Sequence, residues 1–214
     1  MILTPSPPLL ARWCAVVSRT TSAMRAVDIV ALVGVASVGV VASIILVPDW
    51  RGVSGAGLAL LMVAVAAVDA RRFIIPDELT AVALALGLVY AAVEETDIWA
   101  QALAWSALRG AISALAFLGV RVVYRRLRGR EGIGLGDVKL AGVAGVWLDW
   151  PIIPIAIEIA AVAALGAYLI RYFCFGRAVR ATTRMPFGLF LAPAIWISWL
   201  LDTTLLVFPS ASSF

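Results

Sequence analysis

Residues 53–70 read VSGAGLALLMVAVAAVDA, an apolar run whose only charged residue, Asp69, stands next to its end. A helix that rises 1.5 Å per residue needs about 20 apolar residues to cross the hydrocarbon core of a bilayer, and this run approaches that length. A carboxylate in such a segment is costly unless it has a partner or a chemical role. The run therefore predicts a membrane-spanning helix with one position of functional interest.

Comparable apolar runs recur along the whole chain. They occupy residues 26–48, 53–70, 79–93, 102–124, 138–150, 152–175 and 187–208. The 214 residues are 63% hydrophobic and 14% charged, whereas soluble domains are about half apolar and about a quarter charged. We therefore predict an all-α fold, a polytopic transmembrane bundle of six to seven helices, and exclude a soluble core.

The helices are expected to form one domain, residues 26–208, between an N-terminal tail at 1–25 and a C-terminal tail at 209–214. No internal repeat or second soluble domain interrupts this stretch. The runs at 79–93 and 138–150 are short for a full crossing. We expect them to be tilted, longer than these limits, or partly re-entrant.

The charges predict how the helices are oriented. Basic residues gather at 71–72, 121–139 and 171–184, and lysine and arginine mark cytoplasmic loops in membrane proteins. The opposite ends carry mainly acidic residues, namely Asp49, Glu94, Glu95, Asp97 and Asp149. The pattern predicts a multi-pass membrane protein with its N-terminus inside and its C-terminus outside. The tryptophans are expected to form an outer aromatic belt that includes Trp99, Trp147, Trp150 and Trp199.

The chain lacks histidine and has only two isolated cysteines, which limits the kinds of catalytic and metal sites it can form. The chain has no histidine, which excludes histidine metal sites, serine–histidine dyads and the two-histidine zinc motif. Cys14 and Cys174 stand far apart without the spacing of a zinc site, so we predict neither a metal nor a cofactor. The net charge of +4 reflects topology rather than nucleic-acid binding. Any catalysis must use carboxylates, hydroxyls, lysine, arginine or the backbone.

Three carboxylates lie within or at the ends of predicted spans: Asp69, Asp137 and Glu158. Each has a purely structural interpretation. Asp69 could pair at the interface with an arginine at 71–72, Asp137 could cap a turn, and Glu158 is interpreted as a buried structural carboxylate. A non-enzymatic transporter or assembly component that handles ions would depend first on Glu158.

The predicted topology places Asp69 and Asp137 at the same cytoplasmic depth on different helices. Two carboxylates that meet share a proton, so that one deprotonates water while the other donates to a carbonyl group. This is the chemistry of an aspartic protease. Asp69 ends its helix and Asp137 begins one, so the helix dipoles alone predict that Asp137 is ionised and Asp69 protonated.

Four short segments then carry a family resemblance. Residues 69–80 (DARRFIIPDELT) and 134–140 (GLGDVKL) resemble the two signature segments of the type IV prepilin peptidases. Residues 142–147 (GVAGVW) and 185–188 (MPFG) also fit that family. Many members have a proline after Phe-Gly where this chain has Leu189. The Gly-x-Gly-Asp element is shared with presenilin-like proteases, which cut within the bilayer.

The resemblance implies that Asp69 and Asp137 are the catalytic pair of a membrane endopeptidase. Its substrate would be the leader peptide of a prepilin or pseudopilin, cut at the cytoplasmic face of the lipid bilayer, here the bacterial inner membrane. Asp77 is expected to cap the third span or orient Asp69, and Lys139 to steady a carboxylate or anchor the loop. The supporting residues are Gly134, Gly136, Lys139, Pro76 and Asp77.

The resemblance is to the short members of the family. The chain is expected to lack the cytoplasmic domain with paired cysteines that accompanies N-methylation in the long members. The sequence leaves open whether the protein forms a homodimer.

Overall fold

The computed structural model describes residues 26–129, 132–175 and 187–206. In these ranges helices joined by short connections account for the fold and there is no strand, which confirms the all-α prediction. The helices are α2 (Ala26–Leu46), α3 (Trp50–Arg72), α4 (Asp77–Glu94), α5 (Trp99–Arg128), α6 (Leu135–Trp147), α7 (Ile152–Phe175) and α8 (Gly188–Leu201). A 3-10 turn, η1 (Thr96–Ile98), precedes α5, and a π-helical turn, η2 (Asp202–Leu206), follows α8. The predicted tails at 1–25 and 209–214 lie outside the described residues.

Each of the seven apolar runs forms one helix. Five helices are long and apolar enough to cross a membrane, and the chain is a multi-pass membrane protein. The run at 79–93 extends beyond its predicted limits to the 18 residues of α4. The 13 residues of α6 rise only about 20 Å, so α6 is too short to span.

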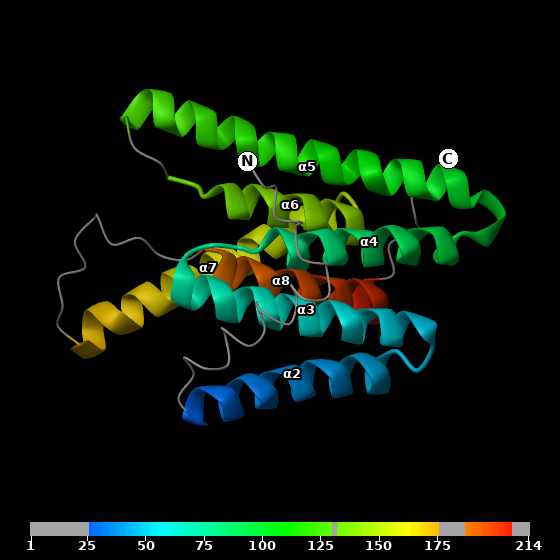
Figure 1. Cartoon of the computed structure of the whole chain (residues 1–214), viewed down its shortest axis with the longest axis horizontal. Helices are drawn as coiled ribbons and strands as arrows, with labels where there is room; N and C mark the ends of the chain where they lie inside the picture. Colours follow the sequence, from blue (N-terminus) through cyan, green and yellow to red (C-terminus); the bar gives the residue numbers. More distant parts are fainter. Residues whose placement is uncertain (1–25, 130–131, 176–186, 207–214) are drawn as a thin grey trace, which may run out of the picture.

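The helices lie side by side along the long axis of the molecule (Figure 1). α2 forms one flank and packs mainly on α3, while α5 forms the opposite flank (Figure 1). Successive helices alternate in direction, so the end of α3, the start of α4, the end of α5 and the start of α6 meet at one end of the bundle (Figure 1). This is the end at which the sequence places its basic residues.

Local chemistry explains where the helices begin and end. The Asp49 side chain accepts hydrogen bonds from the backbone N–H groups of Arg51 and Gly52 and so caps the start of α3. Phe73 ends α3 in the left-handed conformation with φ 54°, and Gly129 ends α5 with φ 62°. Pro76 then turns the chain into α4.

The short helix α6 lies at the centre of the core, and all its residues from Leu140 to Trp147 are buried. It packs closely on α5, because a Cβ added to Gly145 would lie 2.5 Å from the backbone oxygen of Arg109. The Ser106 hydroxyl of α5 donates to the Val146 carbonyl at 2.6 Å. These contacts fix α6, and therefore the residues at its start, relative to α5.

The predicted outer belt of tryptophans is wrong for two of the four residues. Trp147 and Trp199 are 4% and 1% exposed and pack with Tyr90 inside the bundle. The Trp147 indole donates to the Ala83 carbonyl at 2.9 Å, which satisfies its N–H group within the protein. Trp99 and Trp150 are exposed, as a belt requires.

Candidate active site

The two predicted catalytic aspartates lie at the same end of the bundle. Asp69 stands in the last turn of α3 and Asp137 in the first turn of α6, and these helix ends lie at one end in Figure 1. Their exposed fractions are 5% and 8%, so both side chains are buried. The fold thus brings together two acidic residues from distant stretches of the chain.

One isoleucine lies beside both aspartates. A Cβ added to Gly136, next to Asp137, would lie 2.8 Å from Cδ1 of Ile75. A Cβ added to Gly188 would lie 2.8 Å from the same atom and 2.7 Å from Oδ2 of Asp69. Ile75 is 5% exposed and therefore packs tightly between the two glycines. Only glycine fits at either position without a shift of these neighbours.

Asp69 is held by the start of α8. The backbone N–H of Leu189 donates to Oδ2 of Asp69 at 3.0 Å. A proline at this position would have no N–H, so the departure from the family pattern at Leu189 gives this chain a hydrogen bond to the aspartate. Phe187 and Gly188 of the predicted segment lie at the site, while Met185 and Pro186 fall outside the described residues.

The Leu189 contact bears on which of the two aspartates is protonated. The end of α3 disfavours a charge on Asp69, but the start of α8 favours one, because the first N–H groups of a helix attract anions. The prediction that Asp69 holds the proton considered only the helix that carries it. Helix position alone therefore does not assign the shared proton.

Asp137 is held by its own loop. Gly134 is the N-cap of α6, and its backbone N–H donates to Oδ2 of Asp137 at 3.0 Å, so Asp137 is not itself the N-cap. Burial is the main cause that raises the pKa of the Asp137 carboxyl to about 6. The Gly134 amide lowers this pKa, the carboxylate of Asp69 raises it, and Arg121 lowers it. A carboxyl group with this pKa can hold or release a proton near neutral pH.

Two ion pairs lie near the site. Arg71 pairs with Asp28 at 3.6 Å, so this arginine is engaged at the start of α2. Lys139 pairs with the carboxylate of Asp77, which joins the starts of α6 and α4. Both groups of that pair are well exposed, and such pairs contribute at most about 1 kcal/mol. Pro76, not Asp77, is the N-cap of α4, so the prediction that Asp77 caps this helix is wrong.

Glu158 lies apart from this site. It stands about two turns from the start of α7 and is exposed, so the interpretation as a buried carboxylate is wrong. Among the described residues, no group of three or more carboxylates or thiols is placed to hold a metal ion. The site consists of the two aspartates, Ile75 and the backbone of two glycine-containing helix starts.

The sequence did not reveal Ile75 or the Leu189 amide as neighbours of the aspartates. Ile75 belongs to the signature segment 69–80, but nothing in that segment shows that it lies beside both aspartates, and a backbone N–H has no sequence signature. The available signal was the Phe-Gly pair at 187–188, since glycine at a helix start permits close approach of another group.

Comparisons with known proteins show the family to which the chain is similar. The model of the Type IV leader peptidase family matches residues 56–170. The Prepilin leader peptidase/N-methyltransferase of Burkholderia pseudomallei (strain 1026b) is 35% identical over 147 residues, which cover 68% of this chain and 45% of that protein. The protein of that name from Pseudomonas putida is 31% identical over 161 residues, covering 72% of this chain and 53% of the relative.

A shorter relative matches over more of its own length. Leader peptidase HopD of Escherichia coli is 36% identical over 127 residues, which cover 59% of this chain and 78% of that protein. The chain spans about half the length of the longer relatives. No solved structure matches the chain significantly. From the family match and these relatives, the chain belongs to the type IV leader peptidase family.

Proposed function

We propose that this protein is a membrane aspartic endopeptidase that removes the leader peptides of type IV prepilins or pseudopilins. The observation that carries the proposal is the burial of Asp69 and Asp137 together at one end of the bundle. Membership of the leader peptidase family supports the substrate class. The names of the longer relatives include N-methyltransferase, and the proposal for this chain concerns peptide cleavage alone.

The pair acts on one bound water molecule and one peptide bond. With one proton between them, the ionised aspartate removes a proton from water while the protonated one donates to the scissile carbonyl oxygen. The resulting tetrahedral intermediate collapses when its hydroxyl group returns a proton to the pair and the C–N bond breaks. The leaving amine takes a proton from the pair, which restores the state with one shared proton.

The proposal places this site at the cytoplasmic face. The last turn of α3 contains Arg71 and Arg72, and the last turn of α5 contains Arg125, Arg126 and Arg128. Basic residues concentrate on the cytoplasmic side of membrane proteins. A prepilin would therefore be cut where its chain enters the membrane, rather than at mid-bilayer.

Co-expression with the pilin-like precursors of the same organism tests the proposal. Asp69→Asn and Asp137→Asn should each abolish the size shift of the precursor, because an amide cannot exchange the proton that the mechanism needs. Asp97→Asn is the matched control, since Asp97 is exposed in η1 at the opposite end of the bundle. Normal cleavage by either active-site variant, present in membranes at the wild-type level, would refute the mechanism.

The position of the cleaved bond separates this proposal from a presenilin-like activity. N-terminal sequencing of the product should place the cut before the apolar segment of the precursor. A new N-terminus inside that segment would instead indicate proteolysis within the bilayer.

A further inference from the structure

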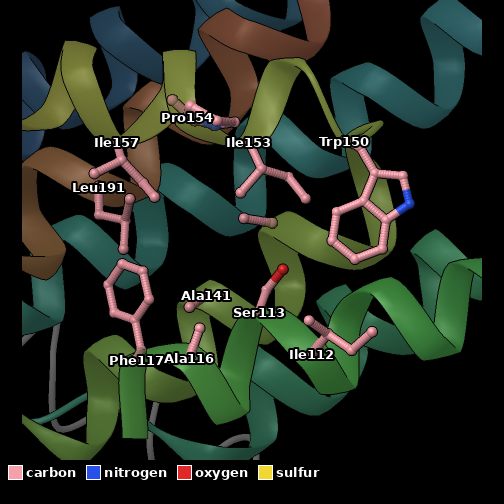
Figure 2. Close-up of a pocket in the computed structure, with 12 residues that line it drawn as sticks. Ile112, Ser113, Ala116, Phe117, Ala141, Trp150, Ile153, Pro154, Ile157 and Leu191 are labelled. Carbon is pink, nitrogen blue, oxygen red and sulfur yellow. The ribbon is translucent and has the colours of Figure 1, made fainter. Parts of the chain in front are cut away.

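A pocket of about 240 Å³ lies on the side of the bundle between α5 and α7. Figure 2 shows Ala116 and Phe117 of α5 on one wall, facing Ile153 and Ile157 of α7. Ala141 and Ala144 of α6 form its floor. We call this feature the side pocket.

The side pocket exists because two neighbouring helices pack on different partners. α5 packs on α6 and α4, whereas α7 packs on α8, and α5 and α7 make no substantial contact with each other. The small side chains of Ala141 and Ala144 leave the space unfilled. The side pocket therefore reaches in as far as Ala141 and Ala144 of the short helix that carries Asp137.

The side pocket lies close to the candidate active site, on two of the helices that carry it. Asp137, Ala141 and Ala144 are spaced i, i+4 and i+7, so they lie along one face of α6. Ala141 is about 6 Å along the helix from Asp137 at 1.5 Å per residue. Leu191 lines the end of the pocket beside Phe117, and it follows by two residues the Leu189 amide that binds Asp69 (Figure 2).

The lining defines what the side pocket can bind. The surface of the pocket is formed almost entirely by carbon atoms, and the Ser113 hydroxyl is one of its few polar groups. Its volume of about 240 Å³ is below the range of roughly 300 to 1,000 Å³ that is usual for small-molecule sites. A pocket of this size and chemistry suits one or two large apolar side chains projecting from a neighbouring helix.

The adjacent face of α7 favours a peptide over a lipid. Glu158 follows Ile157 of the side pocket and is exposed about two turns from the start of α7. A carboxylate that faces acyl chains is costly, whereas a neighbouring peptide helix can offer it a hydrogen-bond donor. The occupant that accounts for both features is a helix with an apolar face.

We propose that the side pocket receives apolar side chains from the membrane segment of the substrate and so aligns the preceding peptide with Asp69 and Asp137. The inference rests on the proposed function, because the substrate is a precursor with a leader followed by an apolar segment. The pocket would hold that segment one to two helical turns from the carboxylates. Binding there selects substrates by the apolar helix in addition to the sequence around the cut.

Disulfide crosslinking tests the location directly. The background carries Cys14→Ser, Cys174→Ser and Asp137→Asn, so that an uncut pilin-like precursor with one cysteine in its apolar segment stays bound. Ala116→Cys at the pocket wall should crosslink to that cysteine under oxidation in membranes. Ala111→Cys is the control, because Ala111 is exposed on the opposite face of α5, and it should crosslink at least about tenfold less. Equal crosslinking at both positions, or none at Ala116→Cys, would overturn the inference.

Filling the pocket gives a kinetic test. Ala116 is exposed, so Ala116→Phe fills the side pocket without disturbing the core, and KM for the full precursor should rise about tenfold. A soluble leader peptide that ends before the apolar segment should be cut equally by wild type and variant. Ala111→Phe should behave as wild type with both substrates.

The outcomes separate the two proposals. If the wild-type protein cuts both substrates and Ala116→Phe does so equally well, the side pocket does not bind the substrate, although the peptidase function stands. If the wild-type protein cuts neither substrate, the proposed function itself is wrong.

Discussion

At the scale of single residues, two glycines determine how closely the aspartates are surrounded. Gly136 and Gly188 allow Ile75 and the Asp69 carboxylate to contact the backbone at the starts of α6 and α8. Any side chain at these positions would displace the groups that hold the carboxylates. We therefore expect the glycines to act as positioning residues, so that their replacement impairs catalysis more than stability.

Gly188→Ala tests this directly. The new methyl group would lie 2.7 Å from Oδ2 of Asp69, so the carboxylate must move, and displacements of about 1 Å can cost roughly 100-fold in rate. We expect a loss of about 10- to 100-fold in kcat with a small change in thermal stability. Gly119→Ala is the control, because a Cβ there meets nothing within 4 Å and should leave kcat unchanged. Wild-type kcat for Gly188→Ala would contradict this role.

At the scale of secondary-structure elements, α6 is the part whose placement matters most. Its thirteen residues are enclosed by α4, α5 and α8, and its first turn carries Asp137. The contact with α5 is close because Gly145 lies against the backbone of Arg109. A shift of α6 would therefore move the side chain of Asp137, which we propose to be catalytic, as well as reduce packing.

Two glycines of α6 provide a matched comparison. A Cβ at Gly145 would lie 2.5 Å from the Arg109 backbone oxygen and 2.6 Å from the Ser113 hydroxyl, whereas at Gly142 the nearest atom is 3.6 Å away. Gly145→Ala should lower the melting temperature and reduce cleavage by at least about tenfold, since overpacking costs roughly 1–3 kcal/mol. Gly142→Ala should retain both properties. Thermal unfolding in detergent and precursor cleavage measure the difference, and similar behaviour of the two variants would refute the account.

At the scale of the whole molecule, the two ends of the bundle differ in charge. The active-site end is rich in arginine, and at the opposite end the arginines are neutralised. There Arg109 pairs with Asp149 at 2.9 Å, and Arg51 pairs with Glu94. This pairing explains how two basic residues are accommodated at the end predicted to face outside, without weakening the charge asymmetry that sets the orientation.

Cysteine labelling in intact cells tests this orientation. In a background with Cys14→Ser and Cys174→Ser, Asp97→Cys should react with a membrane-impermeant maleimide added outside. Ile74→Cys, which is exposed beside the active site, should react only after the cells are opened. The opposite pattern would place the aspartates on the outer face and exclude cleavage from the cytoplasm.

The sequence by itself determined the class of fold, predicted six to seven helices and singled out the two aspartates. These follow from local properties, namely the length of apolar runs, the cost of a charge in a span and short motifs. Only the tertiary structure decided the surroundings of the aspartates: Ile75 between two glycines, the Leu189 amide on Asp69, the burial of Trp147 and Trp199, and the side pocket. Each of these depends on which helix faces meet, and in a chain that is apolar on nearly every face, periodicity does not show which faces those are.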